Sequence, residues 1–311
     1  MTDTADVVER DPSASEHLGL VLDLLTLERR GENEFRGARK PGGRGRVFGG
    51  QVIAQALVAA RATVEAERPA HSLHAYFMRP GSEDHPVDYT VERDRDGGSF
   101  SSRRVLASQD GVPILSMAAG FHRDEGGATH HLPMPEVPPP EELLDETALY
   151  ARDIERIPER MRRWVTRPRP IEQRPVDPIL QWESERKATR SATWFRAAGP
   201  LPDATTPDGR DLHRALLAYA SDTRLLDASM LAHGWSFWER RMQVASLDHA
   251  LWLHEDVALD QWNLYVTDSP WTGHGRGMNR GLIYARDGRL IATVAQEGLV
   301  RRREGSNART D

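Results

Sequence analysis

GGQVIAQALVA, at residues 49–59, predicts a helix, because its apolar side chains recur at helical spacing. Two strand-like segments follow it in the first half, HSLHAYFMRPG (71–81) and QDGVPILSMAAGFHR (109–123). The same order returns in the second half as HRALLAYASDT (213–223), VASLDHALWLHE (244–255) and RDGRLIATVAQEGLVRR (286–302). A repeated order of elements predicts a duplicated domain, with copies at 46–123 and 211–300.

Polar side chains distinguish the second copy from the first. Aligned by hand, the copies pair Asp222 with Val58, Ser246 with Ser72 and Gln296 with Ala119. A carboxylate and a carboxamide thus replace apolar groups, while a hydroxyl is present in both copies. This asymmetry points to a catalytic site in the second copy.

Composition limits the class of protein. A chain of 311 residues that is 39% hydrophobic can bury the cores of two domains, and its net charge of −6 argues against a nucleic-acid partner. No apolar run is long enough to cross a bilayer, and the polar N-terminus does not resemble a signal peptide. We therefore expect a cytoplasmic protein without membrane insertion. The absence of cysteine excludes disulfides, thiol nucleophiles and cysteine-bound metal.

Five segments are predicted along the chain. They are a disordered N-terminus (1–15), a first domain (16–123), a linker (124–180), a second domain (181–303) and a tail (304–311). In the first domain we expect a docking helix around residues 18–25, a hairpin within 25–37, a helix from Gly50, and strands at 72–79, 87–95, 100–108 and 112–122. The proline-rich linker encloses one charged helix at 141–164. In the second domain we expect a strand at 188–197, a helix from about 211, and strands at 244–254, 262–268, 276–286 and 289–301.

Asp222 lies on an apolar face of the second-copy helix, with Ala218 and Leu225 at helical spacing from it. Burial of an ionised carboxylate is unfavourable unless the group is paired or hydrogen-bonded. The position therefore suggests either partners or a chemical role. The alternative is that residues 221–223 end one helix and cap another.

Ser246, Gln296 and the histidines are less informative singly. In the strand expected at 244–254, apolar and polar residues alternate too irregularly to show which face of the sheet carries Ser246. Gln296 is either a buried amide or an edge-strand amide in water. His130, His131, His249 and His254 lack metal-ligand spacing, so we expect structural or exposed histidines and no bound metal. The arginines at 301–303 either form a solvated sheet end or contact phosphate groups.

The chain resembles the acyl-CoA thioesterase II family in six motifs that stand in the family's order. They are RVFGGQVIAQAL, HSLHAYFMRPG, GGSFSSRRV, YASDT, SLDHALWLH and TVAQEGLVR. The resemblance covers about residues 18–303. It implies an α+β double hotdog fold, in which two antiparallel sheets each wrap around a long helix. It also implies a catalytic trio of Asp222, Ser246 and Gln296.

The resemblance further implies hydrolysis of a fatty acyl-CoA to a free fatty acid and coenzyme A, without metal or cofactor. Asp222 is expected to act as general base on water, which Ser246 and Gln296 hold. Gly49 and Gly50 open the first helix, and by analogy with hotdog dimers their N–H groups are expected to stabilise the carbonyl oxygen. The same analogy implies a homo-oligomer.

Two other functions stay open. A hotdog enoyl-CoA hydratase would need an Asp and a His poised on one substrate, but Asp248 and His249 are adjacent in a strand and would point to opposite faces. A non-catalytic acyl-CoA-binding module would keep the pocket without turnover. Thiol release from acyl-CoA distinguishes a thioesterase from both.

Overall fold

The computed structural model describes residues 12–180, 182–183, 185 and 187–303. Its first half contains α1 (Ala14–Leu25), β1 (Glu28–Arg29), β2 (Glu34–Gly37), α2 (Gly49–Arg61), β3 (Ala70–Phe77), β4 (Val87–Asp96), β5 (Phe100–Gln109) and β6 (Val112–His122). The predicted helices, hairpin and strands of this half are confirmed. The first helix starts at Ala14 because Ser13 caps it, and residues 1–11 of the predicted disordered N-terminus lie outside the described residues.

The linker differs from its prediction. Four short helical pieces occupy it: η1 (Pro140–Glu142), α3 (Glu146–Arg152), η2 (Ile154–Arg156) and α4 (Glu159–Thr166). Pro158 lacks the N–H that a continuous helix needs, and it stands at the N-cap of α4 instead. The predicted single helix at 141–164 is therefore wrong. The end of the linker forms β7 (Ile171–Pro175), which pairs with the sheet of the second half.

The second half repeats the order of the first. It contains β8 (Arg190–Ala197), α5 (Pro207–Ser221), α6 (Asp227–Leu231), β9 (Met242–Ser246), β10 (Asp248–Leu253), β11 (Asn263–Gly273), β12 (Arg276–Ala285) and β13 (Leu290–Arg302). The helix expected from about 211 begins earlier, because the Thr206 side chain caps it and Pro207 occupies a first-turn position that needs no N–H. The strand expected at 244–254 is interrupted at Leu247.

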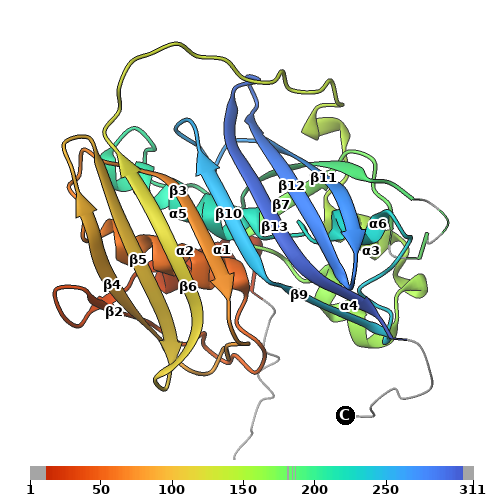
Figure 1. Ribbon diagram of the computed structural model, residues 1–311. Coiled ribbons are helices and arrows are strands. Elements are labelled where there is room, and N and C mark those ends of the chain that lie inside the picture. The colour runs from red at the N-terminus through yellow and green to blue at the C-terminus, as the bar shows by residue number, and fades with distance from the viewer. Residues whose placement is uncertain (1–11, 181, 184, 186, 304–311) are drawn as a thin grey trace, which may run out of the picture.

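One continuous antiparallel sheet joins the two halves. Its strand order is β1-β2-β4-β5-β6-β3-β10-β13-β12-β11-β8-β7, and β9 pairs with β13. The junction is the β3–β10 pair, in which Leu73 lies opposite Leu251. The order is mirrored on either side of this junction, as a duplication predicts, but the strands form one sheet and not two separate ones. Helices α1, α2 and α5 lie behind the sheet (Figure 1).

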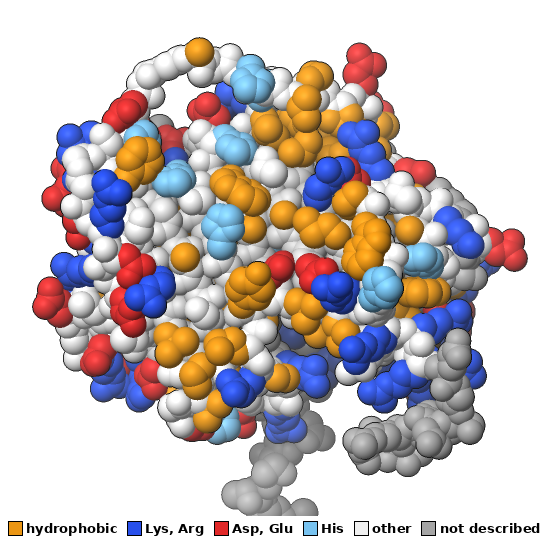
Figure 2. Space-filling view, in the orientation of Figure 1, with side chains coloured by type: hydrophobic (Ala, Val, Ile, Leu, Met, Phe, Trp, Pro, Cys, Tyr) orange, Lys and Arg blue, Asp and Glu red, His pale blue; other side chains and the backbone are white. Residues whose placement is uncertain are grey.

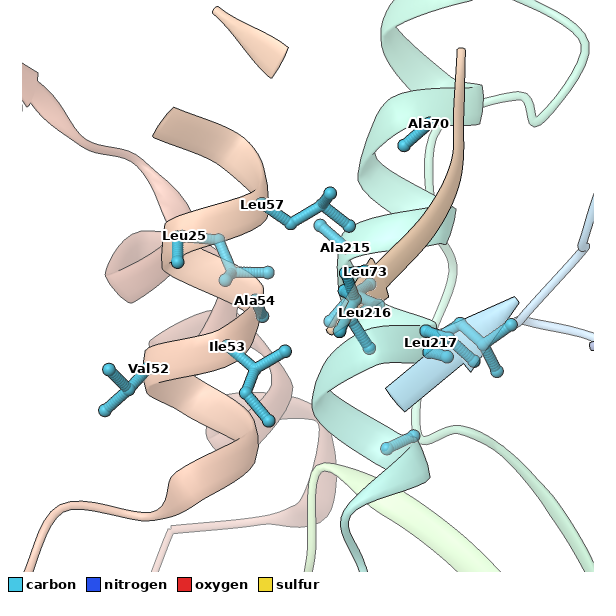
Figure 3. Packing of buried hydrophobic residues seen from close by; sticks show 14 of the residues in the cluster. Leu25, Val52, Ile53, Ala54, Leu57, Ala70, Leu73, Ala215, Leu216 and Leu217 are labelled. Atoms are coloured by element: carbon cyan, nitrogen blue, oxygen red, sulfur yellow. The ribbon is translucent and has the colours of Figure 1, made fainter. Parts of the chain in front are cut away.

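The core lies where α2 and α5 pack against each other and against the sheet. Ile53 and Leu57 of α2 extend toward Leu216 of α5, and all three side chains are buried (Figure 3). The two helices run antiparallel, since an Arg61–Asp211 ion pair of 2.8 Å joins them at one end and residues 50 and 222 meet at the other. None of the helices in the described part of the chain is long and apolar enough to cross a membrane.

A buried hydrogen-bonded group fixes α2 against the strands of the first half. The side chain of Gln55 has no exposed surface; its amide donates to the Leu24 carbonyl at 2.6 Å and accepts the Tyr89 hydroxyl at 2.7 Å. Gly37 leaves room for this amide, because a Cβ at residue 37 would lie 2.6 Å from Gln55 Nε2. Both polar groups of Gln55 are therefore satisfied inside an apolar core.

We expect Tyr89→Phe to lower the free energy of unfolding by about 1–3 kcal/mol, because it leaves the buried Gln55 carbonyl without its donor. Urea denaturation measures the change. Tyr76→Phe is the matched control, since Tyr76 is 66% exposed, and we expect no measurable loss from it. An unchanged midpoint for Tyr89→Phe would contradict the expectation.

Candidate active site

Asp222 lies where the two halves of the chain meet. It is the C-cap residue of α5, and its side chain is 6% exposed. Its Oδ2 accepts the N–H of Gly50 at 2.8 Å, and its Oδ1 accepts the Nε2–H of Gln296 at 2.7 Å. Two of the three candidate residues are thus in direct contact, and the first half supplies a backbone donor.

Helix ends explain how this carboxylate tolerates burial. A negative charge at the C-terminus of α5 is unfavourable by itself, because the carbonyl end of the helix dipole lies there. The N-terminus of α2 compensates, since its free N–H groups and positive dipole end favour an anion. Asp222 does not cap the following helix, whose N-cap is Leu226. Residues 221–223 therefore end α5, as the alternative held, but they do not cap the next helix.

Gln296 is a buried amide, with 0% exposure, on β13 between β10 and β12. The edge-strand alternative is therefore wrong. Because carboxylate oxygens only accept hydrogen bonds, the group that faces Asp222 is the NH₂ of the amide. The Oε1 of Gln296 is buried and forms no hydrogen bond within the described residues. It is a buried acceptor on the same amide whose NH₂ contacts Asp222.

A β-bulge interrupts the strand that carries Ser246. Ser246 pairs with Gly298 and Ala250 pairs with Ala295, so four steps along one strand match three along β13. The extra residue falls next to Ser246, at the break between β9 and β10. Side chains on the two sides of a bulge no longer alternate in simple order. This is why strand alternation could not assign a face to Ser246.

Ser246 faces the helices, on the same side of the sheet as Gln296. Its direct partner Gly298 lies against the Leu226 side chain and stands two residues along β13 from Gln296. Directly paired residues share a face of a sheet. Within the described part of the chain, no hydrogen bond uses the Ser246 hydroxyl. The structure therefore leaves this hydroxyl unused on the face of the sheet that carries Gln296.

Two of the three residue pairs expected between the copies do not occupy equivalent positions. Val58 lies inside α2, whereas Asp222 follows the end of α5. Ser72 pairs with Trp252 on the face away from the helices, because its neighbour Leu73 is fully buried toward them. Ser72 and Ser246 therefore occupy opposite faces. The one-residue bulge is the reason that a simple alignment misjudged the serine.

The sequence offered His249 as a structural or exposed histidine or as half of a hydratase pair, and the structure places it beside Asp222. It has no exposed surface, and its Nδ1 lies 3.9 Å from Asp222 Oδ1. Its Nε2 contacts Ser221 Oγ at 2.9 Å, and that hydroxyl donates its proton to the Ala218 carbonyl. The neutral imidazole must then carry its proton on Nε2, which leaves the buried Nδ1 without a partner in the described chain. The signal in the sequence was a histidine in an apolar strand, together with the Asp222 carboxylate in an apolar helical segment.

Burial perturbs the ionisable groups around Asp222. It lowers the pKa of His249, and the Asp222 charge opposes this effect in part. Burial and the Asp222 charge together raise the pKa of Tyr265 well above its ordinary value. Tyr265 therefore stays protonated and donates to the Ser221 carbonyl at 2.8 Å. The carboxylate thus has neutral polar groups behind it.

Gly49 and Gly50 permit the close approach of the two helix ends. A Cβ at Gly49 would lie 2.8 Å from Asp222 Oδ2 and 2.9 Å from the Phe77 ring, and one at Gly50 would collide with the Tyr219 carbonyl. The Gly50 N–H is already bonded to Asp222. Gly49 is the first residue of α2, a position whose N–H has no partner within the helix.

Two of the cavities among the described residues adjoin α5 and the linker. One of about 40 Å³ adjoins the end of α5 and is lined in part by Ala220, Thr223 and Tyr265. It has room for only a few water-sized groups and cannot hold a lipid tail by itself. Another, of about 490 Å³, is lined by residues of α1, α3, β7 and β8, and none of the candidate trio lines it. Among the described residues, no group of three or more His, Asp or Glu side chains is placed to hold a metal ion.

We expect the stability of the protein to fall as the pH falls below about 6.5, the ordinary pKa of histidine, in part through His249. Its lowered pKa in the folded state means that the unfolded chain binds more protons, so folding stability rises with pH in this range. His249→Gln should lose less stability between pH 7.5 and pH 5.5 than the wild type, by urea denaturation. His130→Gln, an exposed control, should follow the wild type. Identical pH dependence of all three proteins would contradict the assignment.

Comparisons with known proteins place the chain in one family. The chain matches the acyl-CoA thioesterase N-terminal domain model over residues 38–122 and the acyl-CoA thioesterase model over residues 169–299. Human acyl-coenzyme A thioesterase 8 is 40% identical over 298 residues, which are 94% of this chain and 92% of that protein. Acyl-CoA thioesterase 2 of Haemophilus influenzae is 35% identical over 287 residues, which are 92% of this chain and 99% of that protein.

Solved structures agree as well. Acyl-CoA thioesterase II TesB2 from Mycobacterium marinum superposes with a TM-score of 0.73 at 37% identity, over 92% of this chain and 99% of that chain. A hot dog fold protein of unknown function from Alicyclobacillus acidocaldarius, at 19% identity and a TM-score of 0.70, covers 91% of this chain and 98% of its own and shows the fold alone. The chain has a hotdog fold and belongs to the acyl-CoA thioesterase family of thioester hydrolases.

Proposed function

We propose that this chain hydrolyses a fatty acyl-CoA to a free fatty acid and coenzyme A, with Asp222, Ser246 and Gln296 as its catalytic trio. The main support is the hydrogen bonding of Asp222 to Gly50 and to Gln296 at 2.8 Å and 2.7 Å. These bonds hold a nearly buried carboxylate in one orientation at the junction of the two halves. A fixed base with few water contacts is what activation of a single water requires.

The chemistry follows from this placement. A water attacks the thioester carbonyl carbon while an Asp222 oxygen accepts one of its protons. The new C–O bond gives a tetrahedral intermediate, whose collapse breaks the C–S bond and releases the thiolate of coenzyme A. The proton on Asp222 then passes to the thiolate sulfur, which restores the carboxylate for the next turnover.

Ser246 and Gln296 position the water in this mechanism. The Gln296 amide uses its NH₂ on Asp222, and its buried Oε1 is left to accept a hydrogen bond from the water. The Ser246 hydroxyl faces the same side of the sheet and can donate to the water oxygen or accept from it. Water held by both groups would present its lone pair to the substrate carbonyl.

The donor to the developing oxyanion is assigned to Gly49. Gly50 was expected to share this role, but its N–H is bonded to Asp222 in this structure. The Gly49 N–H lies at the positive end of α2 and is not bonded within the helix. An anion that forms on the carbonyl oxygen is favoured at such a helix end.

The geometry bears on both alternatives. A hydratase needs its histidine on the substrate, yet His249 is completely buried, and Asp248 Oδ1 is bonded to the Glu297 N–H at 2.7 Å. This arrangement does not favour a hydratase. An acyl-CoA-binding module without turnover is disfavoured by a carboxylate held ready as a base. Homo-oligomer formation and a cytoplasmic location stay predictions.

We expect Asp222→Asn to lower kcat by about 10²–10⁴-fold with little change in KM, because it removes the general base and keeps the shape of the side chain. Thiol release from a fatty acyl-CoA is the measurement, and the cysteine-free chain adds no background to a thiol reagent. Asp248→Asn is the matched control, since its amide oxygen can still accept the Glu297 N–H. A wild-type kcat for Asp222→Asn would remove the base from the mechanism.

We expect Gly49→Ala to lower kcat by about 10²-fold, because the added methyl displaces the Asp222 carboxylate from its position. Gly19→Ala serves as the control, since a Cβ at Gly19 meets nothing within 4 Å. Thiol release and thermal denaturation are measured on both variants. Full activity of a folded Gly49→Ala protein would show that the helix end does not need this close approach.

A further inference from the structure

A basic groove lies at the end of β9 and β13, the strands that carry Ser246 and Gln296. We call it the arginine groove. Its volume is about 790 Å³, and it is lined by Trp235, Arg241, Gly275, Val300 and the arginines at 301, 302 and 303. Figure 2 shows blue side chains gathered at the lower right of the molecule, near the C-terminal end of β13.

The sheet concentrates positive charge in this groove. The N–H of Arg303 donates to the Arg241 carbonyl at 3.0 Å, which places these two residues directly opposite each other. Arg301 stands two residues along the same strand and shares their face. Like charges directly opposite each other destabilise a sheet. In a chain of net charge −6, this arrangement is most readily explained by an anionic ligand.

Two of these guanidinium groups are unoccupied by protein partners. Arg302 lies 3.0 Å from Glu239, and Arg303 donates to Gln243 at 3.2 Å. Within the described residues, the side chains of Arg241 and Arg301 form no ion pair or hydrogen bond. Both are exposed and border the groove. They are therefore free to contact phosphate oxygens, which guanidinium groups bind in bidentate fashion.

The groove lies at a suitable distance from the trio. Arg301 is five residues beyond Gln296 on β13, which corresponds to about 17 Å at about 3.3 Å per residue. In coenzyme A, the extended pantetheine arm separates the thioester sulfur from the pyrophosphate by a comparable length. A thioester placed at Asp222 would thus bring its phosphates to the neighbourhood of the groove.

The free edge of β9 offers the arm a route. Ser246 and Gln296 face the helices, whereas Arg241 and Arg301 lie on the other face, so the arm has to cross the sheet edge. Among the described residues β9 pairs with no strand other than β13; on its other edge the Met242 N–H donates to the Glu239 carbonyl at 3.0 Å, and the edge beyond it toward Ser246 joins no further strand. The pantetheine arm contains two amide groups, which can hydrogen-bond to such an edge as an added strand does.

An aromatic wall completes the groove. Trp235 stacks on His233, with ring centroids 4.4 Å apart and an interplanar angle of 24°. A flat purine can stack on such a surface. Phosphate-binding cations beside an aromatic ring are the combination that a nucleotide requires.

We propose that the arginine groove binds the 3′-phospho-ADP end of coenzyme A, with Arg241 and Arg301 on its phosphates and Trp235 beside its adenine. This assignment rests on the proposed function, because it presumes an acyl-CoA substrate. It assigns the nucleotide end of the substrate to the second half of the chain.

The test compares a fatty acyl-CoA with the acyl-pantetheine thioester of the same acid, which lacks the nucleotide. For Arg241→Ala/Arg301→Ala we expect KM to rise about tenfold for acyl-CoA, with unchanged kcat and an unchanged KM for acyl-pantetheine. The control Arg280→Ala/Arg289→Ala removes two exposed arginines of β12 and its following turn outside the groove, and should change neither KM. An equal rise for both thioesters, or no rise for either, would overturn the proposal.

A binding experiment separates this proposal from the proposed function. Calorimetric titration of the full chain with adenosine 3′,5′-bisphosphate should show binding that Arg241→Ala/Arg301→Ala loses while its melting temperature is retained. Absence of binding to the wild type would overturn the arginine groove even if thiol release is intact. Binding without thiol release from either thioester would uphold the groove and reject the hydrolase function.

Discussion

The hydrogen bond between the Gly50 N–H and the Asp222 carboxylate is the contact on which the candidate site depends. It requires the N-terminus of one long helix to meet the C-terminus of the other. That meeting in turn requires the antiparallel helix pair and the β3–β10 junction, which place the two halves side by side. The unfavourable end of one helix dipole is thereby compensated by the favourable end of the other. A buried carboxylate can persist here because both helices contribute to its surroundings.

The surroundings of Asp222 are polar but neutral. The amide of Gln296 and the Gly50 N–H donate to it, while His249 and Tyr265 are kept neutral by burial. A neutral surrounding leaves the carboxylate without a full ion-pair partner at hydrogen-bond distance.

Much of the fold followed from the sequence, because periodicity and turn residues are local properties. Asp110 and Gly111 both adopt positive φ in the predicted hairpin turn, for example. The prediction of one helix at 141–164 was wrong because Pro158 interrupts the helix, although the residues around it favour one. Asp222 and Gln296 were found as polar groups in apolar segments. His249 was missed, and the face of Ser246 was left open, because a bulge is set by strand pairing and not by the strand's own pattern.

The opposite end of the helix pair is closed by an ion pair. There Arg61 of α2 lies 2.8 Å from Asp211 of α5, and the C-cap residue of α2, which corresponds to Asp222 at the end of α5, is Ala62. A duplicated domain would have begun with two equivalent ends of the helix pair. Here the Arg61–Asp211 ion pair joins the helices at one end, and the Asp222 carboxylate lies at the other. With the proposed trio as the site, the stoichiometry is one substrate per polypeptide, and any assembly of such chains would carry as many sites as chains and not as many as hotdog units.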